Sequence, residues 1–543
     1  MAAAEAEKPE EEKVAAGELL FCGGTNWDMI GKKTGAAVTG NLVSPTRLRS
    51  LLNVDIRLVA SGCASCHCVA LDVEGRCYTW GRNEKGQLGH GDTHATLLEM
   101  PRIVSGLSKY KIVAAGAGRN HTVVVTDDGN SFAFGWNKHG QLGTGSTKNE
   151  LERSPVRCLV SQVTNAVCGG DFTVWLSSLE GSSILTAGHP QYGQLGHGTN
   201  NEYNLKDASV KLAYEPQPRP RAIASLASKT IVKVACGTNH TVAVDSDGFV
   251  YTWGFGGYGR LGHREQKDEW IPRLVGVFQR HNVLPPTAVV SAGSVSSACT
   301  AGGGQLYMWG KLKTTGDEWM YPKPLMDLSG WNIRCMDSGQ MHHFCGADDS
   351  CISWGQAQYG ELGYGPAGQK SSANPKKVEI LDGMHVISVA CGMGHSLIVV
   401  DRTNVQDKLD ELAVFGGENP EAVIEELKDE DQASNKTLTK GAANASPANS
   451  KKRKKAKDSS ESEDNGADSD FSEDANGQPE VQRGRRGGKA SSRGRGKATK
   501  EVSTEGKKGS GRGRGRPRLA EKKSAESGSG RGRGKAGKRG RAK

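Results

Sequence analysis

The chain has 543 residues and a formal net charge of +10, from 70 Lys and Arg against 60 Asp and Glu. Its acidic start lacks the basic and apolar regions of a secretory signal, and no apolar stretch reaches membrane-spanning length. The thirteen cysteines are scattered along apolar stretches. We therefore expect neither export, nor a membrane span, nor a disulfide framework.

The charge is unevenly distributed, which indicates two parts of different character. Residues 1–403 contain 37 basic and 37 acidic side chains, so residues 404–543 carry the whole positive excess. We expect the first part to be a neutral globule and the second to be an electrostatic appendage.

After an acidic leader at residues 1–16, a repeated motif runs through residues 17–403. Seven segments, such as CYTWG and VYTWG, end in an aromatic or apolar strand closed by glycine, and they recur every 45 to 66 residues. Self-similarity at a period of this size is typical of repeat folds. The closing glycines are Gly23, Gly81, Gly135, Gly188, Gly254, Gly310 and Gly355.

A second motif precedes six of these glycines and predicts another strand. Its clearest copies are CGTNHTVAV at Cys236–Val244 and CGMGHSLIV at Cys391–Val399. Pairs such as Asp247 and Gly248 lie between the two motifs and favour a two-residue hairpin turn, so each unit is expected to contain a β-hairpin. The histidine position of the motif is occupied by His67, His121, Phe172, His240, Ser296, His342 and His395.

The order of the motifs at the two ends predicts how the repeat region closes. It starts with an aromatic-glycine strand and finishes with a histidine motif, so each end is half a unit. If Val389–Val400 pairs with Leu19–Gly23, seven four-stranded blades form a ring that has no open sheet edge. We therefore predict an all-β fold, a seven-bladed β-propeller at residues 17–403 that is closed by its terminal strands.

Several sequence motifs within the repeats resemble motifs of a known family. They are NWDMIGKK from Asn26, TWGRNEKGQLGHGD from Thr79, FGGYGRLGHREQKDEWIPRLV from Phe255 and SGWNIR from Ser329. With the repeat itself, they make the chain resemble the regulator of chromosome condensation superfamily, and within it the second-regulator type, also called the telophase disc protein type. This resemblance implies binding of a small GTPase of the Ran, Rac or Ral type, guanine-nucleotide exchange, and a role in cell-cycle or chromosome regulation.

The sequence contains no motif of covalent catalysis, since it has no P-loop, nucleophile elbow or HExxH helix. We expect a monomer with no catalytic residue, no cofactor and no metal. Nucleotide exchange remains compatible with this expectation, because an exchange factor only has to stabilise the nucleotide-free GTPase through surface loops. The alternative is an adaptor that does not promote exchange and is tethered to DNA or RNA by its tail.

Two groups of residues have metal-binding chemistry. The recurrent histidines surround one axis of the predicted ring, and Cys63, Cys66, His67 and Cys68 carry soft-ligand side chains. No second ligand pair follows at zinc-finger spacing, and two units lack the histidine. We interpret both groups as structural and expect each imidazole to bond a neighbouring turn.

The unit that ends at Gly188 is followed by the longest gap of the repeat. The stretch between Gly198 and Ile231 includes EPQPRPR at Glu215–Arg221. Extra loops on a rigid scaffold are common binding sites, so we predict that this insertion contacts the GTPase and that deletion of residues 200–228 leaves folding intact. The alternative is a solvated loop without a partner.

The last part of the chain predicts a linker and a tail. Residues 404–450 form the linker, with a candidate short helix at residues 422–430, and residues 451–543 have the composition of a disordered tail. A compact basic run at the start of the tail fits an importin groove and predicts nuclear localisation, with the cytoplasm as a second compartment. The basic residues of this run are Lys451, Lys452, Arg453, Lys454, Lys455 and Lys457.

An acidic block, Asp458–Glu480, follows the basic run and contains serines among its nine acidic residues. Acid-directed kinases favour such serines, and phosphorylation would deepen the negative charge that competes with DNA for the basic segment beyond. The candidate phosphorylation sites are Ser459, Ser460, Ser462, Ser469 and Ser472.

Residues 481–543 carry 23 basic and four acidic side chains interleaved with glycine, a composition that attracts nucleic-acid phosphates. The word GRGRPR resembles an AT-hook, whose Arg-Gly-Arg core lies in the narrow minor groove of A·T tracts. Arg-Gly segments also bind RNA. The candidate DNA-binding residues are Arg512, Arg514, Gly515, Arg516, Pro517 and Arg518.

Overall fold

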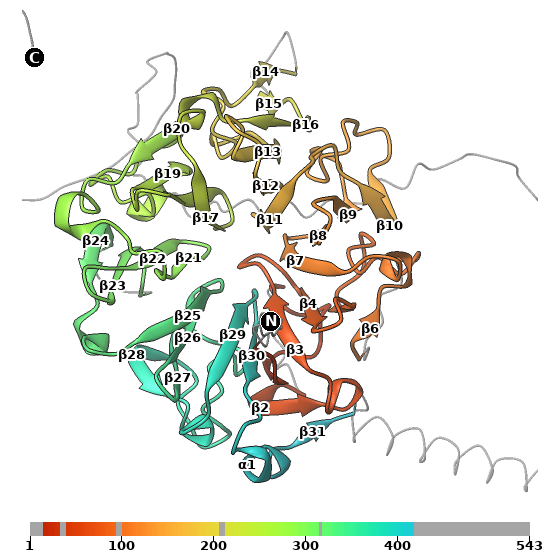
Figure 1. Cartoon of the computed structure of the whole chain (residues 1–543), viewed down its shortest axis with the longest axis vertical. Coiled ribbons are helices and arrows are strands. Elements are labelled where there is room, and N and C mark those ends of the chain that lie inside the picture. Colours follow the sequence, from red (N-terminus) through yellow and green to blue (C-terminus); the bar gives the residue numbers. More distant parts are fainter. Residues whose placement is uncertain (1–14, 33–39, 94–99, 206–211, 314–317, 417–543) are drawn as a thin grey trace, which may run out of the picture. The chain divides into compact units, whose positions relative to one another are not determined.

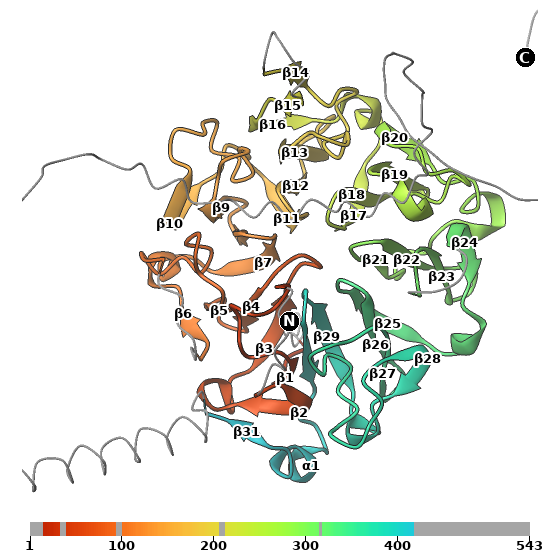
Figure 2. The same ribbon diagram turned by 180° about the vertical axis from the view of Figure 1, so that it is seen from behind.

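The computed structural model describes residues 15–32, 40–93, 100–205, 212–313 and 318–416. Within these ranges, antiparallel sheets stand like blades around a central axis (Figure 1). The reverse view shows the same ring, with the first strand of each blade nearest the axis (Figure 2). The amino-terminal and carboxyl-terminal ends of the ring lie side by side in one blade.

Blades 1 to 6 are four-stranded sheets that follow one another along the chain. Blade 1 contains β3 (Ile56–Ala60), β4 (His67–Asp72), β5 (Cys77–Gly81) and β6 (Arg102–Ile103). Blade 2 contains β7 (Ile112–Ala117), β8 (His121–Thr126), β9 (Ser131–Trp136) and β10 (Leu151–Arg157). Blade 3 contains β11 (Val163–Cys168), β12 (Phe172–Ser177), β13 (Ile184–Gly188) and β16 (Gln217–Ala222).

The next three blades have the same order of strands. Blade 4 contains β17 (Ile231–Cys236), β18 (His240–Asp245), β19 (Val250–Gly254) and β20 (Glu269–Leu274). Blade 5 contains β21 (Val290–Ala292), β22 (Ser296–Ala301), β23 (Gln305–Gly310) and β24 (Trp319–Pro324). Blade 6 contains β25 (Ile333–Ser338), β26 (His342–Ala347), β27 (Ser350–Gly355) and β28 (Ser372–Lys377).

Blade 7 joins the two ends of the ring. Its inner strands β29 (Val386–Cys391) and β30 (His395–Val400) come from the end of the repeat region, and β1 (Glu18–Gly23) and β2 (Leu42–Leu48) come from the start. β1 pairs antiparallel with β30 along its whole length. Neighbouring inner strands contact one another around the ring, and β29 contacts β3. The predicted seven-bladed propeller with terminal-strand closure is therefore confirmed.

The register explains the glycine that closes each aromatic strand. In blade 1, Gly81 lies opposite His67, and in every blade the closing glycine lies opposite the residue at the histidine position, including Gly23 opposite His395 across the closure. Gly81 has a φ of +113°, and a Cβ atom at this position would lie 2.7 Å from the Cα of His67. Only glycine combines this backbone conformation with such a close approach.

The apolar core lies between adjacent blades. Each interface is filled by residues of two neighbouring sheets, as where Trp175 of blade 3 packs with Val123 and Val125 of blade 2. The strand-end tryptophans Trp253 and Trp309 are fully buried in the next two interfaces. Since each blade supplies only part of its own core, no single blade buries enough apolar surface to be stable alone.

Short 3-10 turns add a buried leucine between the outer strand of most blades and the next inner strand. These turns are η1 (Arg49–Leu51), η2 (Ser105–Leu107), η3 (Ala224–Leu226), η6 (Met326–Leu328) and η7 (Glu379–Leu381). The last residue of each, the leucine, is buried. Two further turns, η4 (Gly257–Gly259) and η5 (Arg280–Asn282), lie in connections of blades 4 and 5.

Beyond residue 403, the described residues form a strap on blade 7. The strap consists of the helix α1 (Gln406–Asp410) and the strand β31 (Val414–Phe415), which pairs parallel with β2. Leu409 of α1 is fully buried in the apolar core between blades 6 and 7. Arg47 of β2 donates from Nη1 to the carbonyl oxygen of Leu409 and forms an ion pair with Asp410 at 2.9 Å.

The insertion predicted between Gly198 and Ile231 is shorter than expected. Residues 217–222 form β16, the outer strand of blade 3, so most of EPQPRPR belongs to the blade. Only β14 (Glu202–Asn204) and β15 (Leu212–Tyr214) leave the ring, as a separate two-stranded hairpin. Deletion of residues 200–228 would therefore remove a blade strand, and the expectation that it spares folding is wrong.

Candidate partner-binding face

One repeated hydrogen bond places two sets of loops on the same face of the ring. In blade 2, the amide of Trp136, just after the closing glycine, donates to the carbonyl oxygen of Asn120, just before the histidine, at 2.8 Å. The corresponding bond occurs in each of the seven blades, for example from Arg82 to Cys66 at 2.9 Å. We call this the loop face; the turns between the second and third strands of each blade lie on the opposite face.

Backbone bonds between blades tie the loop face together near the axis. The amide of Arg119 donates to Gly170, whose own amide donates to Thr238, at 2.9 and 2.8 Å. The amide of Met393 in blade 7 donates to Ser65 in blade 1 at 2.8 Å. These bonds hold the loops of neighbouring blades in fixed relative positions, which favours a preformed binding surface.

The recurrent histidine links each blade to the next one. The Nε2 atom of His67 lies 2.7 Å from the hydroxyl of Thr122 in blade 2, and that hydroxyl donates to the carbonyl oxygen of Gln87. Because the hydroxyl hydrogen is used in this second bond, the imidazole must donate from Nε2. His121 and Thr173 repeat the arrangement between blades 2 and 3.

The same relay joins other blades with small changes. His240 lies 2.8 Å from Ser297, and His342 lies 3.0 Å from Ser396. Burial lowers the pKa of these imidazoles, to about 4 for His342. The histidines are thus neutral structural donors, as interpreted from the sequence, although their partner is a hydroxyl on the next blade rather than a turn.

The side chains of Cys63, Cys66 and His67 in blade 1 contact different partners and do not converge on one point. The sulfur of Cys63 lies 3.5 Å from the hydroxyl of Thr238, and Cys66 contacts the sulfur of Met393 at 3.8 Å. Among the described residues, no group of three or more His, Cys, Asp and Glu side chains is placed to hold a metal ion. All thirteen cysteines are free thiols, and burial raises the pKa of Cys77 to about 12.

Cation–aromatic pairs lie among the turns of the loop face. Lys85 and Lys138 lie 5.5 and 5.7 Å from the ring centroid of Trp136. Farther round the ring, Lys311 lies 4.7 Å from the ring centroid of Tyr258. Such pairs hold positive charge above aromatic surface, a combination suited to an acidic or phosphate-bearing partner.

The hairpin of blade 3 connects to the loop face through aromatic contacts. The rings of His139 and His189 are 4.2 Å apart, and His189 meets Tyr214 of the hairpin at 5.8 Å. Burial lowers the pKa of His139 to about 4, so the imidazole of His139 is neutral at physiological pH. The hairpin also exposes Tyr203 and Leu212 by nearly half. Its attachment is therefore fixed, whereas its apolar side chains face solvent.

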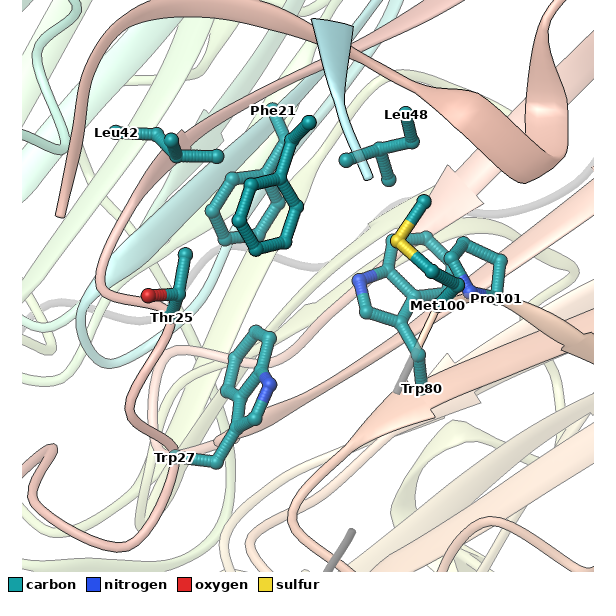
Figure 3. Close-up of a pocket in the computed structure, with 9 residues that line it drawn as sticks. Phe21, Thr25, Trp27, Leu42, Leu48, Trp80, Met100 and Pro101 are labelled. Carbon is teal, nitrogen blue, oxygen red and sulfur yellow. The ribbon is translucent and has the colours of Figure 1, made fainter. Parts of the chain in front are cut away.

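Two hollows differ in their capacity for a ligand. The apolar one lies between blades 7 and 1, where Phe21, Trp27 and Trp80 surround it (Figure 3), and Phe415 of the strap completes the lining. Its volume is about 20 Å³, room for little more than one water molecule, so it is a packing gap. The second, on the loop face beside Glu361, has a volume of about 170 Å³ and polar walls.

The other predicted sites lie outside the described residues. These are the candidate helix at 422–430, the basic run at 451–457, the serines of Asp458–Glu480 and the AT-hook word at 513–518. No helix within the described ranges combines the length and the apolar character that a bilayer crossing requires. The binding features of the loop face were not predicted individually, because they arise where turns of different blades meet.

The fold and the repeated loop face define the chain as a closed seven-bladed β-propeller built from one repeated unit. The family profile described as the regulator of chromosome condensation (RCC1) repeat matches residues 74–125, 128–176, 183–244, 247–299 and 348–399. Human protein RCC2 is 40% identical over 407 residues, which cover 70% of this chain and 76% of that protein. The chain therefore belongs to the regulator of chromosome condensation repeat family.

Other relatives agree with this assignment. The RCC2 homolog of Danio rerio is 39% identical over 413 residues, covering 72% of this chain and 82% of that protein. Among solved structures, Prp20p of Saccharomyces cerevisiae superposes with a TM-score of 0.57 at 19% identity, covering 77% of this chain and 96% of that one. At this identity, the likeness supports the fold alone.

Proposed function

We propose that this chain is a nuclear, chromatin-associated scaffold that binds a small GTPase on its loop face and promotes guanine-nucleotide exchange. The main observation in support of the proposal is the set of cation–aromatic pairs on that face, which includes Lys85 and Lys138 beside Trp136. Kinship supports it, since Prp20p has been described with its binding to Gsp1p and histones. Exchange follows if the face binds the nucleotide-free GTPase more tightly than the loaded one.

The hairpin β14–β15 is the element proposed to reach beyond the ring and contact the GTPase. Its exposed Tyr203 and Leu212 provide apolar contact area, and its aromatic contact with His189 fixes it beside the loop face. The amide of Glu215 already donates to the carbonyl oxygen of Asn201 at 2.9 Å. Replacement of residues 202–214 by Gly-Gly would retain this bond as a two-residue turn.

The test measures nucleotide release from Ran-, Rac- and Ral-type GTPases with the full chain and the hairpin variant. We expect the full chain to accelerate release from one type, and the variant to weaken capture of that nucleotide-free GTPase at an unchanged melting temperature. The double variant Lys85→Glu and Lys138→Glu should weaken capture further. Equal capture by all three proteins would overturn the assignment of the face.

The second candidate is an adaptor that binds partners without exchange. The rigid, preformed loop face suits it equally well, because binding alone requires no difference between nucleotide states. Capture of a GTPase without faster nucleotide release across the panel would favour the adaptor. No capture of any GTPase would remove the GTPase from both proposals.

We also propose that the tail supplies nuclear import and nucleic-acid binding. A relative, yeast RCC1 (Prp20), has been solved bound to Kap60. Replacement of Lys452, Arg453 and Lys454 by Ala should shift the chain to the cytoplasm in cell imaging. Replacement of Arg514 and Arg516 by Ala should lower the salt dependence of DNA affinity by about 0.9 in log–log slope for each lost phosphate contact. An unchanged slope, or unchanged preference for A·T tracts, would count against the AT-hook.

A further inference from the structure

A polar recess opens on the loop face between blades 6 and 7. Its volume is about 170 Å³, several times the ~30 Å³ share of one water molecule. Gln340, Gln356 and Gln358 contribute amides to the wall, and Met341 and Met393 contribute thioethers. None of the described residues that line the recess carries a positive charge.

The negative charge of the recess belongs to Glu361. Only 3% of this residue is exposed, and its carboxylate accepts hydrogen bonds from the amides of Gln358 and Tyr359, at 2.9 and 2.7 Å. Burial raises its pKa, although these bonds favour the charged form. The amide of Gln358 also lies 3.2 Å from the second carboxylate oxygen. A carboxylate can accept about four hydrogen bonds, so it retains capacity for one more donor that enters the recess.

The other blades show that the fold does not require a charge at this position. The position of Glu361 in the Gly-x-Leu-Gly turn is held by Gln87, Gln141 and Gln194 in blades 1 to 3. Each of these glutamines accepts the same local backbone bond, as where Gln87 accepts from the amide of Lys85 at 2.8 Å. The carboxylate therefore adds charge to a turn that a neutral amide already stabilises.

Blade 4 shows which group fits beside this turn. There the position is held by Arg260, whose guanidinium lies 4.6 Å from the ring centroid of Phe255 and donates to the carbonyl oxygen of Ser294 at 2.6 Å. Ser294 belongs to the loop of the next blade, where Met393 is the equivalent residue beside Glu361. In blade 4, the guanidinium of Arg260 thus occupies the place that corresponds to the open recess of blade 6.

We propose that the recess beside Glu361 binds the guanidinium group of an arginine side chain from a basic partner peptide. A guanidinium is planar and presents five donors, which match the carboxylate and the amide oxygens of the glutamines. The ring of Tyr359 and the two methionines provide apolar surface for the aliphatic stem. The proposal names a ligand other than the GTPase, and the recess lies at blades 6 and 7 rather than beside Trp136, so it goes beyond the proposed function.

The test titrates the full chain with acetylated and amidated Gly-Ser-Arg-Ser-Gly by calorimetry at physiological salt. Glu361→Gln is the decisive variant, because glutamine occupies the same position in three other blades and folding should be preserved. Its matched control is Glu180→Gln, which removes an exposed carboxylate on the opposite face. A second peptide carries citrulline in place of arginine and so keeps the shape without the charge.

We expect Glu361→Gln to weaken binding of the arginine peptide about tenfold or more, as the loss of a charge-assisted hydrogen bond implies. The control variant should bind like the unmodified chain. The citrulline peptide should bind both proteins equally weakly, because the charge pair is already absent. Equal binding of the arginine peptide to both proteins, or no binding to either at millimolar peptide, would overturn the proposal.

Discussion

The Nε2 atom of His395 lies 3.0 Å from the hydroxyl oxygen of Ser61, across the junction between blades 7 and 1. Ser61 in turn donates to the carbonyl oxygen of His67 at 3.2 Å. At the other histidine relays the hydroxyl residue follows the histidine position of the next blade, whichever residue holds it, but here Cys68 follows His67 and Ser61 takes over the role of the hydroxyl. The junction of the two ends of the ring is therefore bonded like the other interfaces between blades.

The relay predicts a measurable difference between two substitutions of His121. His121→Phe removes the bond to Thr173 but keeps the volume, as Phe172 does naturally in blade 3, and should cost ~0.5–1.5 kcal/mol of stability. His121→Ala also opens a cavity and should cost ~3–5 kcal/mol. Urea unfolding of both variants checks this, with exposed His281→Ala as a control. Equal stability of the alanine and phenylalanine variants would contradict it.

Stability should fall as the pH drops below about 6.5. Burial lowers the pKa of His67 and His395 to about 3 and that of His121 to about 4, against 6.5 for an ordinary histidine. Between these values the unfolded chain binds protons that the folded chain refuses, so acid favours unfolding. Asp337, whose pKa burial raises to about 7, acts in the opposite sense, but it is one group against several.

Melting temperatures from pH 7.5 to 5 test this dependence. They should decline steadily below pH 6.5, and the decline should be shallower in His121→Phe, which lacks one of the titrating groups. A melting temperature that stays constant over this range would show that the buried imidazoles do not control acid stability.

The repeat made the architecture predictable, since two motifs with fixed spacing define the hairpin of each blade. The half units at the two ends also gave the closure correctly, and β1 pairs with β30 as expected. The predicted boundaries of the insertion in blade 3 were wrong because a blade strand there has an unusual composition. β16 contains two prolines and two arginines, a composition that predicts a loop. An outer strand pairs with a neighbour on one side only, so its free side tolerates proline.

Removal of the first strand should prevent the ring from closing. β1 buries Leu19, Leu20 and Phe21 almost completely, worth ~1.5–3 kcal/mol each, which together approach the whole stability of a typical domain. Deletion of residues 15–23 should therefore abolish the cooperative melt and produce aggregates in size-exclusion chromatography. The matched deletion of residues 2–13 should leave both unchanged; a monomeric, normally melting product of the first deletion would refute the closure.

The strap on blade 7 predicts a contrast within one short segment. Leu409→Ala empties a fully buried position and should cost ~2–5 kcal/mol, whereas Val414→Ala, at 41% exposed, should cost less than ~0.5 kcal/mol. Thermal melts of the two variants measure the difference. Should Leu409→Ala melt with the unmodified chain, α1 would have no part in the stability of the ring.

The loop face was less predictable than the ring, for a physical reason. Its features depend on which turns meet in space, as where Glu361 of blade 6 and Met393 of blade 7 line one recess. The sequence did show a signal, since Glu361 and Arg260 break a series of glutamines in the Gly-x-Leu-Gly turns. That departure has meaning only once the neighbouring blade is known.

The pairing of β1 with β30 also has a consequence for folding during synthesis on the ribosome. Roughly 370 residues must be translated between the two strands, which takes on the order of 20 to 75 seconds at usual elongation rates. During this interval β1 can pair with β2, which follows it closely in the chain, but β30 is not yet available to pair with its other edge. The nascent chain thus presents an unpaired apolar strand edge until β30 has been translated, and such an edge invites pairing with other chains.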